Sequence, residues 1–277
     1  MHAWVNAIFI IQLVLTTVHG YSAETPLPLN FSINENLLAL QMLNAKRPSP
    51  LGVSDAVQTL RAKAREAYPD AMAQAEKEND LLPNLTTSAK YASAIQYVRR
   101  LAEFQPILRE TQQHLHDIKN LFDVQAFNGS VYRILDRILK FSVDREHSIT
   151  VLSPQFSESF SIGNRQVLYG SPQLIDNHAL IHIVHECLHT YLDTMTKPSD
   201  VDHAIIELAI DYQLRKDLNS KDSFLNYTSV GHTSLHGIRS TIGNLHWESY
   251  LRSRESLVNF AQRMNQLYRN STLIGSP

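Results

Sequence analysis

Residues 182–193, HIVHECLHTYLD, contain two histidines four positions apart, with a glutamate directly after the first. In a helix, His185 and His189 lie on one face one turn apart, so both imidazoles can bind a single Zn²⁺. Glu186 then lies beside the open position of the metal, where its carboxylate can take a proton from a water molecule. Apolar residues surround the motif and predict a buried helix: Ile181, Ile183, Val184, Leu188 and Leu192.

A hydrolytic zinc site needs a third protein ligand, which leaves the fourth position for water. The next predicted helix, residues 201–218, offers Glu207, with 17 residues between it and His189. Asp211 follows one turn later on the same face, where it can accept a hydrogen bond from a ligand histidine. The Gly and His that extend the motif in metzincins do not occur at the expected positions, and that subclass is excluded.

This arrangement resembles the gluzincins, the thermolysin-like and aminopeptidase-like zinc metallopeptidases. By that resemblance, the zinc ligands are His185, His189 and Glu207, the general base is Glu186, and Asp211 supports a ligand histidine. The resemblance covers about residues 180–212. The sequence departs from the family in a slightly shorter gap before the glutamate, in Ile206 where the family often has Asn, and in lacking the Gly-x-Met-Glu-Asn signature of exopeptidases. It implies a zincin-like catalytic region, one zinc ion per chain, and a peptide or protein substrate.

The same resemblance implies two further parts of an active site. Gluzincins bind the substrate backbone along a strand above the metal, and residues 165–171, RQVLYGS, are the natural candidate. A downstream His or Tyr often stabilises the oxyanion in this family. The polar loop before the last helix supplies three alternatives, Tyr227, His232 and His236, among which the sequence does not choose.

The remaining sequence predicts an α+β protein that is predominantly helical. Residues 1–20 carry no charged side chain and predict a secretory signal peptide, so we expect a secreted or periplasmic protein, or one held in the membrane by an uncleaved N-terminal segment. Residues 21–145 form a helical N-terminal region, with a helix from Ser54 and a kink at Pro106. Residues 146–277 form the zincin-like catalytic region.

A small sheet is expected at the start of the catalytic region. Three short segments there are rich in β-forming residues: 148–152, 159–162 and 165–169. Gly163-Asn164 separates the last two segments and predicts a hairpin. The helix with the zinc motif follows, and the chain closes with a helix over residues 245–270.

Charge and cysteine content exclude several other classes of function. The net charge of −2 argues against nucleic acid or an anionic membrane as partner, and no membrane contact is expected beyond the signal segment. Cys187 is the only cysteine, which rules out an intramolecular disulfide, and we expect it to be a small buried hydrophobic residue. His203, one turn before Glu207, is a candidate for lining the cleft.

The predicted function is that of an exported zinc metallopeptidase with Glu186 as general base. The main alternative is a catalytically inactive protein that keeps a zincin fold for binding or inhibition. A coincidental motif on an ordinary core helix is less favoured, because polar ligands are costly to bury without a purpose. A di-iron bundle would need a second Glu-x-x-His besides Glu186-x-x-His189, and the sequence has none.

Overall fold

In the computed structural model, the described part of the chain is mostly helical with one small four-stranded sheet, which confirms the α+β class. The structure describes residues 29–44, 52–77, 89–124, 127–143, 146–156, 159–162, 165–171, 178–192, 200–218 and 236–274. The contacts divide the chain into two compact units. The sheet unit contains residues 28–128 and 145–190, and the C-terminal unit contains residues 129–144 and 191–277.

The sheet has the strand order β1-β2-β4-β3. Its strands are β1 (Asn30–Ser32), β2 (Ser148–Val151), β3 (Ser159–Ser161) and β4 (Gln166–Tyr169). β2 lies between β1 and β4 and is parallel to both, whereas β3 pairs with β4 in antiparallel fashion. The antiparallel pair confirms the predicted hairpin, although Gly163-Asn164 itself lies outside the described residues.

The position of β4 corrects one expectation about substrate binding. β4 contains most of the segment expected to bind a substrate backbone, but it is hydrogen-bonded to β2 on one side and to β3 on the other. A strand that is paired on both sides has no free ladder of backbone groups to offer a peptide. Among the described strands, β1 and β3 form the two edges of the sheet.

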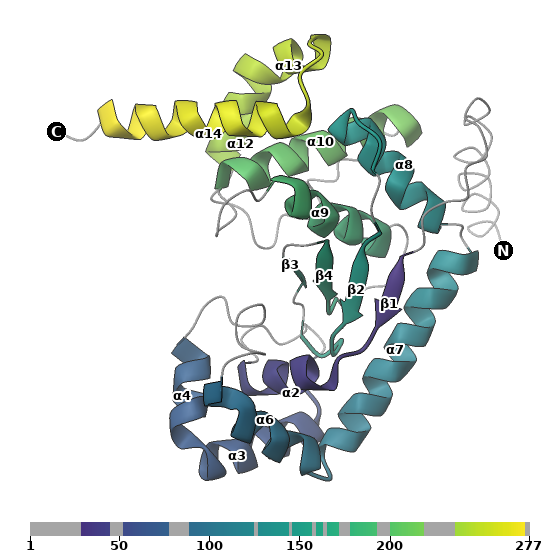
Figure 1. The fold of residues 1–277 in the computed structure, drawn as a ribbon, viewed down its shortest axis with the longest axis vertical. Coiled ribbons are helices and arrows are strands. Elements are labelled where there is room, and N and C mark those ends of the chain that lie inside the picture. Colours follow the sequence, from purple (N-terminus) through teal and green to yellow (C-terminus); the bar gives the residue numbers. More distant parts are fainter. Residues whose placement is uncertain are drawn as a thin grey trace. The chain divides into compact units, whose positions relative to one another are not determined.

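Among the described residues of the sheet unit, five helices complete its N-terminal part and contribute to a common apolar core. They are α2 (Glu35–Asn44), α3 (Asp55–Ala67), α4 (Pro69–Lys77), α6 (Ala89–Arg100) and α7 (Phe104–Val124). Figure 1 shows α3, α4 and α6 gathered around α2, while α7 runs along β1. All residues of α2 from Leu37 to Asn44 are buried, so this helix is the centre of the core.

Two local signals set the bounds of these helices. Ser54 caps α3, since its side chain accepts a hydrogen bond from the backbone N–H of Val57, as expected for a helix that begins there. The kink expected at Pro106 is wrong: α6 ends at Arg100, and a new helix, α7, begins at Phe104. Pro106 therefore lies in the first turn of α7, where a missing backbone N–H costs no intrahelical hydrogen bond.

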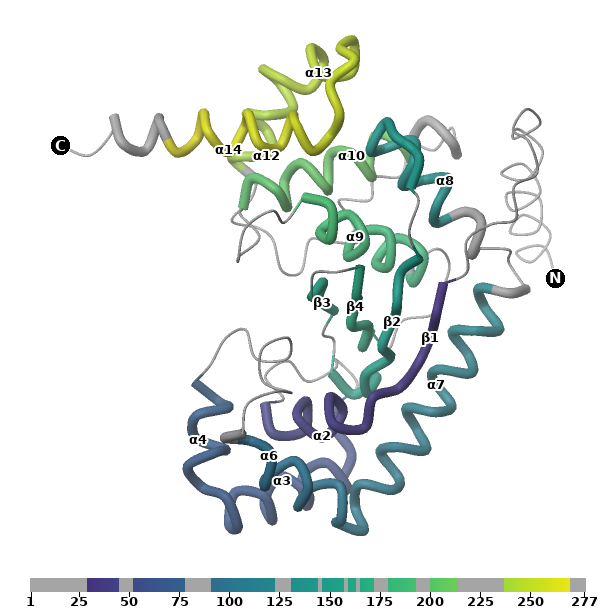
Figure 2. Tube along the Cα trace, in the orientation of Figure 1, coloured from purple at the N-terminus to yellow at the C-terminus, as the bar shows by residue number. Residues whose placement is uncertain are grey.

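The His-Glu-x-x-His motif lies on α9 (His178–Leu192), and most of that helix belongs to the sheet unit. Figure 2 shows α9 in green next to the strands of the sheet. Two residues that directly precede strands interact with α9: His147 before β2 and Arg165 before β4. The sheet and this helix are thus connected by polar as well as apolar groups.

The C-terminal unit consists of helices in the part of the chain that the structure describes. They are α8 (Phe127–Leu139, which begins two residues before the unit), α10 (Asp200–Leu218), α12 (His236–Ile242), the π-helix η2 (Gly243–Trp247), α13 (Glu248–Arg252) and α14 (Leu257–Ile274). The prediction of a single closing helix over residues 245–270 is therefore wrong, because the helical structure is interrupted between α13 and α14. At this break Lys140 donates hydrogen bonds to the carbonyls of Tyr250 and Ser253.

None of the helices in the described residues combines the length and apolarity that a bilayer crossing needs. The predicted signal peptide, residues 1–20, lies outside the described residues.

Candidate metal centre

His185 and His189 face each other on one buried face of α9. They are 7% and 2% exposed, and their Nε2 atoms lie 3.2 Å apart. Two ligands of a tetrahedral zinc ion, with Zn–N bonds of about 2.0–2.1 Å, are separated by about 3.3–3.4 Å. The two imidazoles therefore already have nearly the spacing at which both can bind one metal ion.

The rest of α9 fixes this pair and leaves the glutamate accessible. Apolar residues bury most of the helix: Ala179, Leu180, Ile181, Ile183, Val184, Leu188 and Leu192. Glu186 is only partly buried, one position further round the helix from His185. Two buried imidazoles that could bind a metal ion thus lie beside a carboxylate that is partly exposed.

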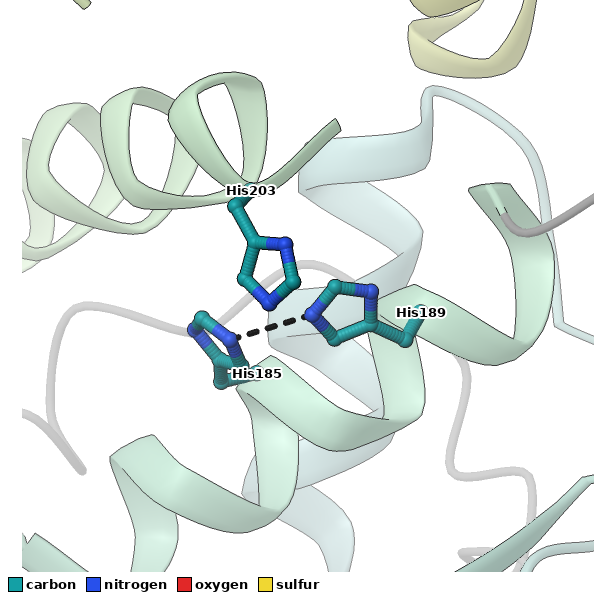
Figure 3. A group of neighbouring side chains, drawn as sticks. All are labelled: His185, His189 and His203. Atoms are coloured by element: carbon teal, nitrogen blue, oxygen red, sulfur yellow. Dashed lines mark hydrogen bonds between the residues drawn. The ribbon is translucent and has the colours of Figure 1, made fainter. Parts of the chain in front are cut away.

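A third histidine completes a possible ligand group. The ligand nitrogens of His185, His189 and His203 all lie within 4.8 Å of one another (Figure 3). His203 comes from α10 and is partly exposed, in contrast to the two buried histidines of α9. Three imidazoles could hold a metal ion, and such a donor set suits zinc, copper, iron or nickel.

Glu207, the third ligand expected from the resemblance, has a different neighbour. Its carboxylate is fully buried, and Oε2 accepts a hydrogen bond from Arg239 Nη1 of α12 at 2.6 Å. No donor among the described residues lies within hydrogen-bonding distance of the other oxygen, Oε1. The group of close ligand atoms contains His203 and does not include Glu207. Asp211, one turn further along α10, is also buried.

The side chains expected to stabilise the oxyanion lie outside the described part of the structure. Tyr227 and His232 lie outside the described residues. His236 is the first residue of α12, but its side chain is likewise outside the described part. Their roles stay predictions.

Other polar groups lie on the side of α9 that faces the sheet. His147 is fully buried, and its Nε2 lies 3.2 Å from the hydroxyl of Thr190. Burial, together with the positive charge of Arg165, lowers the pKa of His147 to about 4, so this imidazole is neutral at pH 7. Arg165 has a φ of 61°, in the left-handed region that is strained for a residue with a side chain.

Cys187 points into the interior, as predicted. It is a free cysteine with no exposed surface, and burial raises the pKa of its thiol. A thiol that is neutral and inaccessible is a poor nucleophile. The described structure therefore gives Cys187 a packing role.

Sequence reasoning missed three residues at or near this centre. His203 was assigned only to the wall of a cleft, although its position one turn before Glu207 is a signal that α10 offers two possible ligands on one face. Arg239 and Arg165 carry no local pattern that would indicate their buried contacts.

Comparisons of this chain with protein families, with curated proteins and with solved structures give no match.

Proposed function

We propose that this protein is an exported zinc-dependent peptidase whose metal is held by His185, His189 and a third ligand from α10. The observation that supports this most is the 3.2 Å separation of the two Nε2 atoms on a buried helix, with Glu186 between the two histidines in sequence. Two imidazoles in this arrangement fit zinc, and α10 offers His203 or Glu207 as the third ligand. Peptide as the substrate class is taken from the resemblance to gluzincins.

A bound Zn²⁺ supplies Lewis-acid polarisation of a carbonyl group and makes a nearby water more acidic. The carboxylate of Glu186 accepts the proton of the attacking water and returns it to the amine of the leaving group. His185 and His189 stay fixed during these transfers because their helix is buried on most of its surface. Tyr227, His232 or His236 is proposed to donate a hydrogen bond to the oxyanion.

The partly exposed position of Glu186 favours an enzyme over an inactive binding protein with the same fold. A carboxylate beside two metal ligands must reach both solvent and substrate to move protons, and Glu186 is open enough to do so. A binding protein would need no such group. The inactive binding protein is the second candidate function, and its zinc ion would have only a structural role.

The test is a Glu186→Gln variant, which removes the base and keeps the shape of the side chain. The purified protein should contain about one zinc per chain by mass spectrometry and should cleave a library of quenched fluorescent peptides. The variant should keep its zinc but lose a factor of about 10²–10⁴ in kcat/KM. Glu248→Gln, at an exposed glutamate of α13, is the matched control and should cleave like the wild type.

Three results would contradict the proposal. A protein without metal would remove its basis, and a Glu186→Gln variant with full activity would show that another group is the base. Zinc binding without cleavage of any peptide would favour the binding protein.

A further inference from the structure

Two side chains of α10 compete for the role of third ligand. His203 and Glu207 are four residues apart in this helix, so they lie on one face about one turn from each other. We infer that His203 is the ligand that α10 supplies, and that Glu207 is withheld from the metal as the counter-ion of Arg239. This inference rests on the proposed metal site and specifies its ligands.

The first argument is the environment of Glu207. Its side chain has no exposed surface, and the side chain of Arg239 is only 13% exposed. The 2.6 Å contact between them is a charge-assisted hydrogen bond with little water around it. A rotation of Glu207 that broke this contact would leave the guanidinium without its carboxylate in a place where water cannot replace it, which is strongly unfavourable. In the orientation that keeps this contact, Glu207 does not belong to the group of close ligand atoms.

The second argument is the position of His203. One of its ring nitrogens lies within 4.8 Å of the ligand nitrogens of both His185 and His189. The ring is partly exposed, so it has room to adjust its orientation toward a metal, unlike the two buried rings. Figure 3 shows His203 reaching from α10 toward the two rings of α9. A third imidazole needs no deprotonation at neutral pH to become a ligand.

The two arguments together give Arg239 and Glu207 a definite role. The pair joins α10 to α12, and these two helices pack against each other within the C-terminal unit. Arg239 is therefore a positioning residue, which fixes the carboxylate of Glu207 and keeps the metal site an all-histidine site. The predicted site would have three neutral ligands, with the charge of Glu207 balanced by Arg239.

The test measures metal binding directly with Co²⁺, whose visible spectrum reports the number and type of its ligands. His203→Gln should lower the Co²⁺ affinity at least about 100-fold and change the spectrum, because a ligand is lost. His116→Gln, at an exposed histidine of α7, is the matched control and should bind like the wild type. Glu207→Gln should keep the spectrum and change the affinity less than about threefold, while its melting midpoint falls because Arg239 loses its counter-ion.

Glu207→Asp covers the case in which the Gln variant fails to fold, since it keeps the charge for Arg239. It should also bind Co²⁺ with the wild-type spectrum, whereas a shortened ligand would change that spectrum. The inference is overturned if the Glu207 variants lose Co²⁺ affinity as His189→Gln does, and if His203→Gln does not. If His185→Gln and His189→Gln both bind Co²⁺ like the wild type, the proposed metal site itself fails.

Discussion

His147 is a buried neutral base, and its protonation should affect the stability of the fold. The imidazole has no exposed surface, and burial beside Arg165 lowers its pKa to about 4, compared with about 6.5 in an unfolded chain. Between these two values the unfolded chain binds more protons than the folded one. The free energy of unfolding must therefore fall as the pH is lowered through this window.

We predict that this effect contributes up to about 3 kcal/mol between pH 7 and pH 4. His147→Gln removes the titrating group, so its free energy of unfolding should depend less on pH than that of the wild type. Urea unfolding of both proteins at several pH values, with a chelator present, measures the difference. If the free energies of unfolding of the two proteins changed with pH in the same way, His147 would have the same pKa in the folded and unfolded chains.

The residues of the candidate site differ in how far the sequence could predict them. His185, Glu186 and His189 belong to one helix, so their spacing alone gives their relative positions, and the structure brings the two histidines together as expected. The partner of Glu207 could not be predicted in this way. Arg239 lies 32 residues further along the chain, and only the packing of α12 on α10 brings it to this carboxylate.

Among the elements, α2 is connected to the sheet by a buried hydrogen bond that should be important for stability. The side-chain oxygen of Gln41 accepts a hydrogen bond of 2.9 Å from the backbone N–H of Ser153, just after β2, and Gln41 has no exposed surface. Gln41→Leu has a similar size but no acceptor, so the N–H of Ser153 would lose this partner in a buried position. Such a loss costs about 1–3 kcal/mol.

Equilibrium unfolding in urea tests this expectation. Gln41→Leu should lower the free energy of unfolding by that amount. Gln112→Leu, at an exposed position of α7, is the control and should stay within about 0.5 kcal/mol of the wild type. Equal stability of the two variants would mean that the contact between α2 and the sheet does not depend on this hydrogen bond.

The elements also show which parts of the fold depend on local sequence. The β3–β4 hairpin and the helix of the zinc motif have clear local patterns, and both were predicted. β1 was not, because a strand of three residues is too short for a periodic pattern and its parallel partner, β2, lies more than a hundred residues away. Local spacing predicts an element, whereas long-range pairing decides how a sheet is completed.

At the scale of the whole molecule, stability without disulfides must come from the core and from any bound metal. Cys187 is the only cysteine of the chain, and it is buried. Any ion that binds the folded chain and not the unfolded one stabilises the fold by mass action, by about 2.7 kcal/mol at a free concentration one hundred times its Kd. The proposed zinc site should therefore be visible in thermal unfolding.

We predict that zinc raises the melting midpoint of the metal-free protein by several degrees, since about 1 kcal/mol corresponds to a few degrees for a chain of this size. Mg²⁺ should not raise it, because magnesium prefers oxygen ligands to imidazole. A variant with both His185→Gln and His189→Gln should lose the response to zinc, whereas a reducing agent should leave every midpoint unchanged. An equal rise with zinc in the double variant would place the stabilising zinc at a different site, and the proposed chemistry at Glu186 would lose its metal.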